Sequence, residues 1–205
     1  MASGAGETPR GLIIAIGAST GGPKALLKLL RGLATAPQAR ILIVQHIAKD
    51  FATGLAAWLD RESPFAVRLA QAGDFLQPGV ALVAPPNQHM ELQGGRILLS
   101  DAPPRHACRP SVDALFESLA LATAPQVVGV LLTGMGRDGA AGLLALHQAG
   151  AQTIVQDQAS SVIFGMPKAA IALGAAQQTL PLEQIPAAVL RLLNNCKRPP
   201  AVPSA

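Results

Sequence analysis

Five short apolar runs, separated by segments of helix length, restrict the fold of this chain more than any other feature. The runs are rich in Val, Ile and Leu and show no polar alternation, which is typical of strands buried on both faces of a parallel sheet. They cover residues 12–16, 41–45, 80–84, 127–132 and 152–156. A sheet of this kind needs helices on both of its faces.

Helix signals fill most of the intervals between the runs. Pro23 suits a first helical turn, Ser111 is a suitable N-cap and Gly150 a stop. The segments of helix length are 23–33, 51–61, 111–122 and 140–148. Because parallel strands are joined by right-handed crossovers, this order predicts an α/β fold with a doubly wound, mostly parallel, Rossmann-like sheet.

One region departs from the alternation. In "MELQGGRILLS", residues 90–100, Gly94 and Gly95 separate two short extended runs. This pattern predicts a β-hairpin insertion, which we expect either to pair antiparallel at the edge of the sheet or to flank the active site.

The length of 205 residues suits one domain. Residues 11–195 are predicted to form it. Residues 1–10 and 196–205 are small, polar or rich in proline and are predicted to be disordered tails.

Composition and charge exclude several classes of protein. No apolar run approaches the roughly 20 residues of a membrane helix, and residues 1–10 contain no apolar stretch of the length expected in a signal peptide. The two cysteines, Cys108 and Cys196, have neither metal-ligand nor redox spacing, so we expect a cytoplasmic protein without a metal site. The 16 basic residues are scattered and aromatic residues make up only 3% of the chain, which disfavours nucleic-acid binding.

The first apolar run leads into a glycine-rich turn, "GASTGGPK", at residues 17–24. A dinucleotide site needs G-x-G-x-x-G here and an acidic residue at the end of the second strand. The second glycine is missing and the second strand ends in Gln45-His46. Lys24 also lies outside a G-K-[ST] phosphate loop. We therefore expect no nucleotide cofactor.

The same turn fits G-x-S-x-G from Gly17 to Gly21. In that pattern a tight strand-to-helix turn exposes the serine hydroxyl, and free N–H groups at the helix start stabilise an oxyanion. Ser19 is thus a candidate nucleophile. The pattern alone leaves open that Ser19 only caps the helix.

A nucleophilic serine needs a base and a carboxylate at the same edge of the sheet. His46 follows the second strand directly and is favoured over His89, which also follows a strand, because the first crossover is the neighbouring one. For the carboxylate, Asp138 follows the run 127–132 and leads Asp157 only modestly. The order Ser, His, Asp differs from that of an ordinary α/β-hydrolase.

Six separated motifs together resemble one known family. They are "IGASTGGPKAL", "VQHI", "APPNQHM", "RPSVDALFESLA", "LLTGMGRDGAAGL" and "QDQASSVIFGMPKAAIALG", in this order. The chain resembles the catalytic domain of the protein-glutamate methylesterases of bacterial chemotaxis over residues 12–193.

The resemblance implies a role for each of five residues. Ser19 is the nucleophile, His46 the general base and acid, and Asp138 the carboxylate that orients His46. The backbone N–H of Met135 helps to form the oxyanion hole, and Thr20 lies near the scissile ester.

The resemblance also implies the substrate, a glutamate γ-methyl ester on the cytoplasmic helices of a chemoreceptor, with methanol as a product. Some members also deamidate receptor glutamines, and the chemistry needs no cofactor, metal or membrane insertion. Typical members carry an N-terminal receiver domain, whereas the first strand here is predicted from Leu12. We therefore expect either a stand-alone esterase or an isolated catalytic domain, with any receiver protein separate.

Two other functions remain as alternatives. One is an esterase or deamidase that acts on a different protein in a chemotaxis-like pathway. The other is a Rossmann-like nucleotide-binding protein.

Overall fold

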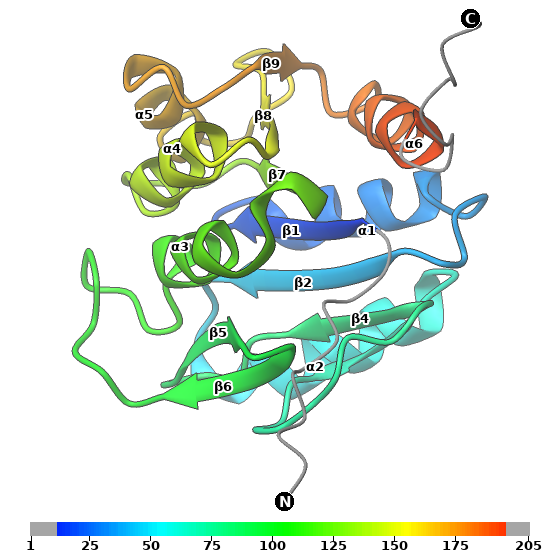
Figure 1. The fold of residues 1–205 in the computed structure, drawn as a ribbon, viewed down its shortest axis with the longest axis vertical. Helices are drawn as coiled ribbons and strands as arrows, with labels where there is room; N and C mark the ends of the chain where they lie inside the picture. The colour runs from blue at the N-terminus through cyan, green and yellow to red at the C-terminus, as the bar shows by residue number, and fades with distance from the viewer. Residues whose placement is uncertain (1–11, 196–205) are drawn as a thin grey trace, which may run out of the picture.

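The computed structural model describes residues 12–195, so the two predicted tails lie outside the described residues. A seven-stranded, all-parallel sheet with the order β3-β4-β2-β1-β7-β8-β9 runs through its centre (Figure 1). Its strands are β1 Ile13–Ala18, β2 Arg40–Gln45, β3 Ala66–Leu69, β4 Val80–Val83, β7 Val127–Leu131, β8 Gln152–Gln156 and β9 Gln178–Leu180. The predicted α/β doubly wound fold is confirmed.

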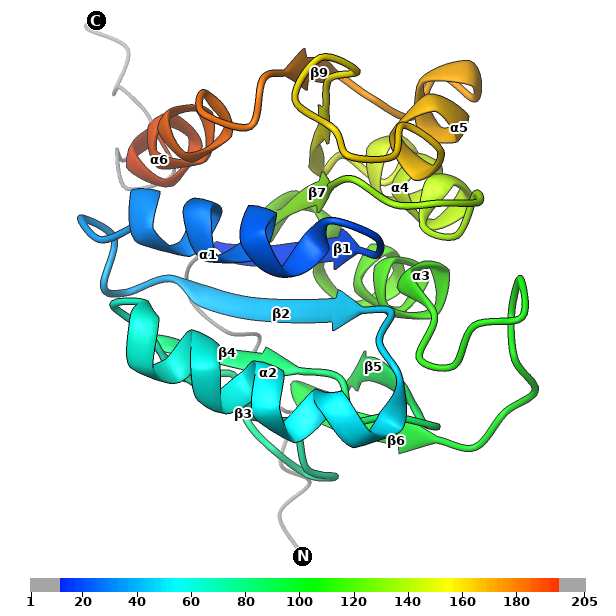
Figure 2. The same ribbon diagram turned by 180° about the vertical axis from the view of Figure 1, so that it is seen from behind.

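Helices cover both faces of this sheet. They are α1 Gly22–Gly32, α2 Lys49–Glu62, α3 Val112–Thr123, α4 Ala140–Gln148, α5 Met166–Ala172 and α6 Ile185–Asn195, with a short 3₁₀ turn, η1 Ala124–Gln126. Figure 1 looks onto the face that carries α3, α4 and α5, and Figure 2 onto the face with α1 and α2.

Side chains of β1 alternate between two hydrophobic cores. Ile14 and Ile16 belong to the core formed with α1, α2 and α6, whereas Ile13 and Ala15 belong to the core formed with α3, α4 and α5. Successive residues of a strand point to opposite faces. An apolar run without alternation therefore follows directly from burial on both faces, which is what the sequence pattern predicted.

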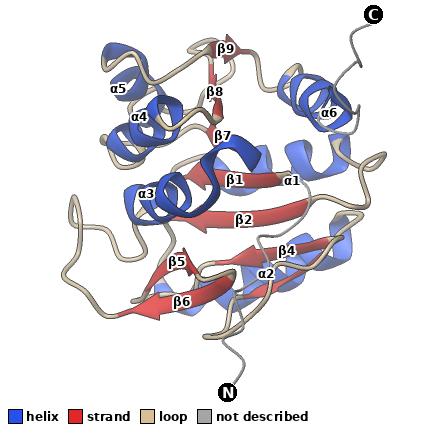
Figure 3. Cartoon of the chain, viewed as in Figure 1, coloured by secondary structure: helices blue, strands red, loops and turns tan. Residues whose placement is uncertain are grey.

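The predicted hairpin is present as β5 His89–Gln93 and β6 Arg96–Ser100, paired antiparallel. It forms its own two-stranded sheet and packs against α3, so the first of the two expected placements, pairing at the edge of the main sheet, is wrong. A long loop then leads from β6 to α3, drawn in tan beside the hairpin in Figure 3. This loop carries residues 101–110 past the carboxyl ends of the strands toward the start of α3.

The strand order reverses between β1 and β7, and ligands of open α/β sheets bind at such a switch point. In the register of the sheet, Ala18 pairs with Gln45 and Gly17 pairs with Leu131. Segments that leave β1, β2 and β7 therefore emerge side by side. None of the described helices is both long and apolar enough to span a membrane.

Candidate active site

Ser19 is the first residue after β1 and is partly exposed. Its backbone N–H donates to the carbonyl of Thr133 at 3.0 Å, which ties the turn to the segment after β7. The N-cap of α1 is Gly21, with no side-chain hydrogen bond, so Ser19 does not cap this helix. Within residues 12–195, Ser19 Oγ makes no hydrogen bond, which leaves the hydroxyl available for chemistry.

Two glycines allow the turn to pack against its neighbours. A Cβ on Gly134 would lie 2.8 Å from Ser19 Cβ and closer still to the sulfur of Met166. A Cβ on Gly22 would collide with the side-chain oxygen of Gln45. The glycines of this region therefore serve close approach around Ser19, where the sequence had only indicated a tight turn.

The buried amide of Gln45 joins the two segments that carry Ser19 and His46. Gln45 Nε2 donates to the carbonyl of Ser19 at 2.8 Å and to the carbonyl of His46 at 2.9 Å. From the sequence, Gln45 was notable only as the residue that stands where a nucleotide site needs a carboxylate. A polar side chain at the end of a fully apolar strand was the available signal, because a buried amide must find partners.

Replacing Gln45 with leucine is expected to slow the reaction of this site and to destabilise the fold by about 2 kcal/mol, because the partly buried carbonyls of Ser19 and His46 each lose a donor. Turnover and urea unfolding measure the two effects. Gln177→Leu is the matched control, since its amide accepts from Thr153 N–H at the start of β8, at the opposite end of the sheet. Equal loss of turnover in both variants would mean that Gln45 does not position the site.

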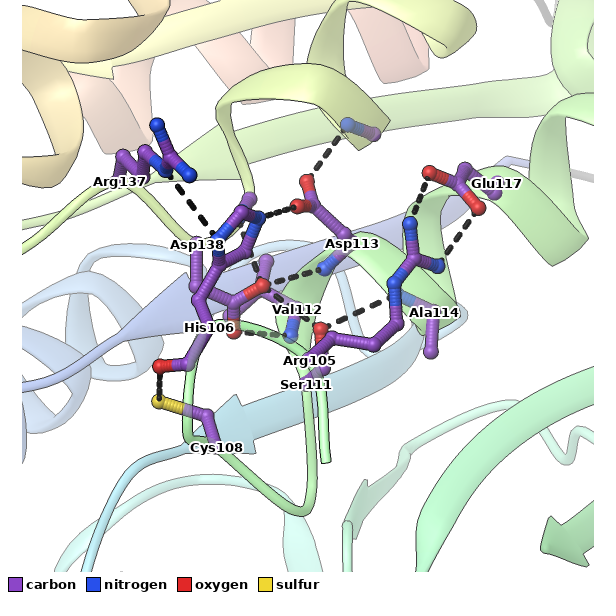
Figure 4. A network of polar contacts seen from close by, with 12 residues as sticks. Arg105, His106, Cys108, Ser111, Val112, Asp113, Ala114, Glu117, Arg137 and Asp138 are labelled. Carbon is purple, nitrogen blue, oxygen red and sulfur yellow. Dashed lines mark hydrogen bonds and ion pairs between the residues drawn. The ribbon is translucent and has the colours of Figure 1, made fainter. Parts of the chain in front are cut away.

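His46 follows β2 and is hydrogen-bonded to Asp138 in the loop after β7, with 2.8 Å between His46 Nε2 and Asp138 Oδ2. Asp138 is only 2% exposed. Its Oδ1 accepts from Ser111 Oγ at 2.6 Å, and four further donors complete the set: His46 Nε2 and the backbone N–H groups of Val112, Asp113 and Gly139. The start of α3 thus holds the carboxylate (Figure 4).

Burial by itself raises the pKa of Asp138, but the hydrogen bonds from His46, Ser111 and the first N–H groups of α3 outweigh burial and leave this pKa below its ordinary value. Asp138 is therefore a carboxylate at neutral pH. A carboxylate can only accept, so the proton of neutral His46 lies on Nε2 and the lone pair on Nδ1.

A second carboxylate links α3 to α4. Asp113, fully buried in the first turn of α3, accepts from the N–H of Gly142 at 2.6 Å. Its other oxygen lies 3.1 Å from His106 Nε2, and Arg137 Nε donates to His106 Nδ1 (Figure 4). Burial raises the pKa of Asp113, only partly offset by the bond from Gly142. Asp138, in the loop just before α4, thus binds the start of α3, and Asp113, in α3, binds the start of α4.

The two alternative candidates are engaged in other bonds. His89 is buried, accepts from Ser111 N–H at 3.1 Å and lies 3.2 Å from the carbonyl of Pro103 through its other nitrogen. Asp157 accepts from the N–H and the hydroxyl of Ser160, in the turn after β8. The structure joins neither of them to Ser19 or His46 by a hydrogen bond.

Met135 and Thr20 lie at the surface of this region. The Met135 side chain is 75% exposed, and its backbone N–H has no hydrogen-bond partner within residues 12–195. Thr20 is exposed, and its carbonyl accepts from Thr133 Oγ1 at 2.9 Å. Free donors beside a serine hydroxyl are what an oxyanion site requires.

Cys108, from the loop before α3, is a neighbour of His46 that the sequence analysis missed. Its sulfur lies 3.8 Å from His46 Nδ1, although the two residues are 62 positions apart. Burial and the charge of Asp138 raise the pKa of the Cys108 thiol, which keeps it protonated at neutral pH. Ligand atoms of His46, Cys108 and Asp138 all lie within 4.8 Å of one another, a spacing that suits a metal ion. His106, Asp113 and Asp138 form a second such group.

Comparisons with known proteins identify the family of this chain. Residues 14–189 match the CheB methylesterase family. The chain is 50% identical over 186 residues to a protein-glutamate methylesterase/protein-glutamine glutaminase of Burkholderia lata, which covers 90% of this chain and 56% of the relative. A second one, from Anaeromyxobacter dehalogenans, is 50% identical over 180 residues, 88% of this chain and 53% of the relative.

A solved structure resembles this one closely. The crystal structure of the Thermotoga maritima CheB methylesterase catalytic domain superposes with a TM-score of 0.85 at 34% identity, covering 90% of this chain and 100% of that one. The chain spans about half the length of the curated relatives it matches. The family match, the identity to the relatives and the shared fold agree. The chain belongs to the CheB methylesterase family.

Proposed function

We propose that this chain is a serine hydrolase that removes methyl groups from glutamate γ-methyl esters on the cytoplasmic helices of chemotaxis receptors. The single observation that carries the proposal is the His46–Asp138 hydrogen bond beside Ser19, at the switch point of the sheet. The relatives' names include both methylesterase and glutaminase, which supports a second activity, deamidation of receptor glutamines. We place the enzyme in the cytoplasm, where a separate receiver protein would regulate it.

The first half of the reaction forms an acyl-enzyme. His46 Nδ1 takes the proton of the Ser19 hydroxyl while the oxygen attacks the γ-carbonyl carbon of the ester. Asp138 holds His46 through Nε2–H and balances the charge of the imidazolium that forms. The Met135 N–H donates to the oxyanion of the tetrahedral intermediate, and Thr20 lies beside the ester.

Departure of methanol completes the acyl-enzyme, and hydrolysis of the acyl-enzyme is the second half of the reaction. Imidazolium His46 protonates the departing methoxide, which leaves as methanol. Water, deprotonated by His46, then attacks the acyl-enzyme, and glutamate and free Ser19 are regenerated. With a glutamine side chain the same steps release ammonia.

An apolar rim around Ser19 favours a protein substrate over a small ester. Met135, Val162 and Ile163 are 75%, 66% and 40% exposed. Val162 lies over Gly21 in the Ser19 turn, and the carbonyl of Ile163 accepts from Gly134 N–H at 3.0 Å. Exposed apolar side chains gathered at a reactive group mark a surface that another macromolecule covers.

The decisive experiment measures methanol released from a purified, methylated receptor cytoplasmic fragment. Release at a rate above that on small methyl esters supports the proposal. Hydrolysis of small esters with none on receptor fragments would instead favour a different methylated protein as substrate.

The stability of the folded chain is expected to fall in acid as Asp138 becomes protonated. The folded pKa of Asp138 is lowered, so the stability that this carboxylate contributes is complete above the unfolded value of about 3.9 and is lost as the pH falls through the folded pKa. Circular dichroism at decreasing pH measures this loss. An Asp138→Asn variant that loses as much stability in acid as the unchanged chain would contradict the prediction.

A further inference from the structure

His46 Nδ1 and Cys108 Sγ are spaced like two ligands of one metal ion. The two atoms lie 3.8 Å apart. In a tetrahedral zinc site, bonds of about 2.0 Å to nitrogen and about 2.3 Å to sulfur put these atoms about 3.5 Å apart. A shift of a few tenths of an ångström in the loop that carries Cys108 would therefore complete the pair.

Asp138 has the position, relative to His46, of the carboxylate that accepts a hydrogen bond from a metal-bound histidine. Ligating histidines usually donate their other N–H to a carboxylate, which fixes the ring and raises its basicity. Asp138 already accepts from His46 Nε2 at 2.8 Å, and its other hydrogen bonds come from the Ser111 hydroxyl and three backbone N–H groups. It would orient His46 for the ion, as it orients His46 for the reaction.

The ion would have access and room for further ligands. Both His46 and Cys108 are partly exposed. A cavity of about 390 Å³ adjoins Cys108 and is lined by His106, Cys108, Met135, Gly136, Arg137 and Asp138. Water molecules in this cavity can fill the remaining coordination positions.

We infer that His46 and Cys108 form an inhibitory binding site for zinc and for similar divalent ions that prefer nitrogen and sulfur ligands. On binding, the Cys108 S–H bond breaks, its proton goes to solvent, and the thiolate and the Nδ1 lone pair each bond to the ion. No redox step is involved. The inference rests on the proposed function only for its consequence: an ion on Nδ1 prevents His46 from taking the proton of Ser19.

Direct binding tests the site without reference to activity. The untagged full chain is titrated with Co²⁺ and Zn²⁺. One ion should bind per chain, with the absorption of a thiolate-to-cobalt charge transfer. Cys108→Ser should abolish this absorption and weaken Zn²⁺ binding by about tenfold or more. His147→Gln and Cys196→Ser are the matched controls for the ligand types and should bind as the unchanged chain does.

Inhibition of ester hydrolysis by Zn²⁺ is the second test of the site. The rate of each variant with metal is compared with the rate of the same variant without metal. Zn²⁺ should inhibit the unchanged chain at about tenfold lower concentration than it inhibits Cys108→Ser, whereas Mg²⁺, which prefers oxygen ligands, should not inhibit. Absence of Zn²⁺ binding, or equal binding by Cys108→Ser, overturns the inference. Binding without any ester hydrolysis would instead overturn the proposed function and leave the metal site standing.

Discussion

Ser19→Ala is expected to lower ester hydrolysis on the order of 10⁴-fold or more while the protein stays folded. The variant removes the attacking oxygen. It removes no hydrogen bond among residues 12–195, because Ser19 Oγ makes none there. Methanol release from a methylated receptor fragment measures the first effect, and the midpoint of thermal unfolding the second.

Ser63→Ala is the matched control. Ser63 is also a partly exposed serine, but it is the C-cap of α2, at the end of the sheet away from the site. Its variant should keep full activity. Full activity in Ser19→Ala would remove Ser19 as the nucleophile, whatever the geometry around it.

Asp138→Asn is expected to lower turnover by about 10²- to 10⁴-fold and, unlike Ser19→Ala, to destabilise the fold by about 3 kcal/mol. Each carboxylate oxygen of Asp138 accepts from more than one donor: Oδ1 from Ser111, Asp113 and Gly139, and Oδ2 from His46 and Val112. An amide NH₂ in either position therefore faces other donors. Turnover and urea unfolding measure the two losses.

Asp157→Asn is the matched control for Asp138→Asn. Asp157 also follows a strand at this end of the sheet, where one of its oxygens accepts from the N–H and the hydroxyl of Ser160, and the amide oxygen of asparagine can keep both bonds. The variant should keep its turnover. If Asp157→Asn were the inactive variant and Asp138→Asn the active one, Asp138 would not be the partner of the base.

The central strands were predictable because burial on both faces requires a continuous run of apolar residues, which is visible in a single sequence. β3 and β9 were missed since they are the edge strands, short and partly exposed, and lack a continuous apolar run. The helices α5 and α6 were missed as well, although α6 has an apolar face. Pattern alone therefore predicted the middle of the sheet better than its borders.

The site was predictable as far as strand topology positions it. Ser19 and His46 follow directly from the ends of adjacent parallel strands. Asp138 and Asp157 could not be separated in the same way, since both follow strands; what distinguishes them is that α3 brings its first N–H groups to Asp138. Cys108 lies beside His46 because of how the loop of residues 101–110 folds, and no local sequence pattern indicates that contact.

The carboxylate bonds that Asp138 and Asp113 make between α3 and the start of α4 affect how the protein unfolds. Asp138 binds N–H groups of α3, and Asp113 binds an N–H group of α4, so detaching either helix strips the other of a buried acceptor. The pair should open as one cooperative unit. A partly unfolded molecule that has released this pair also releases the carboxylate bonded to His46, so the proposed hydrolysis would require the whole unit to be folded.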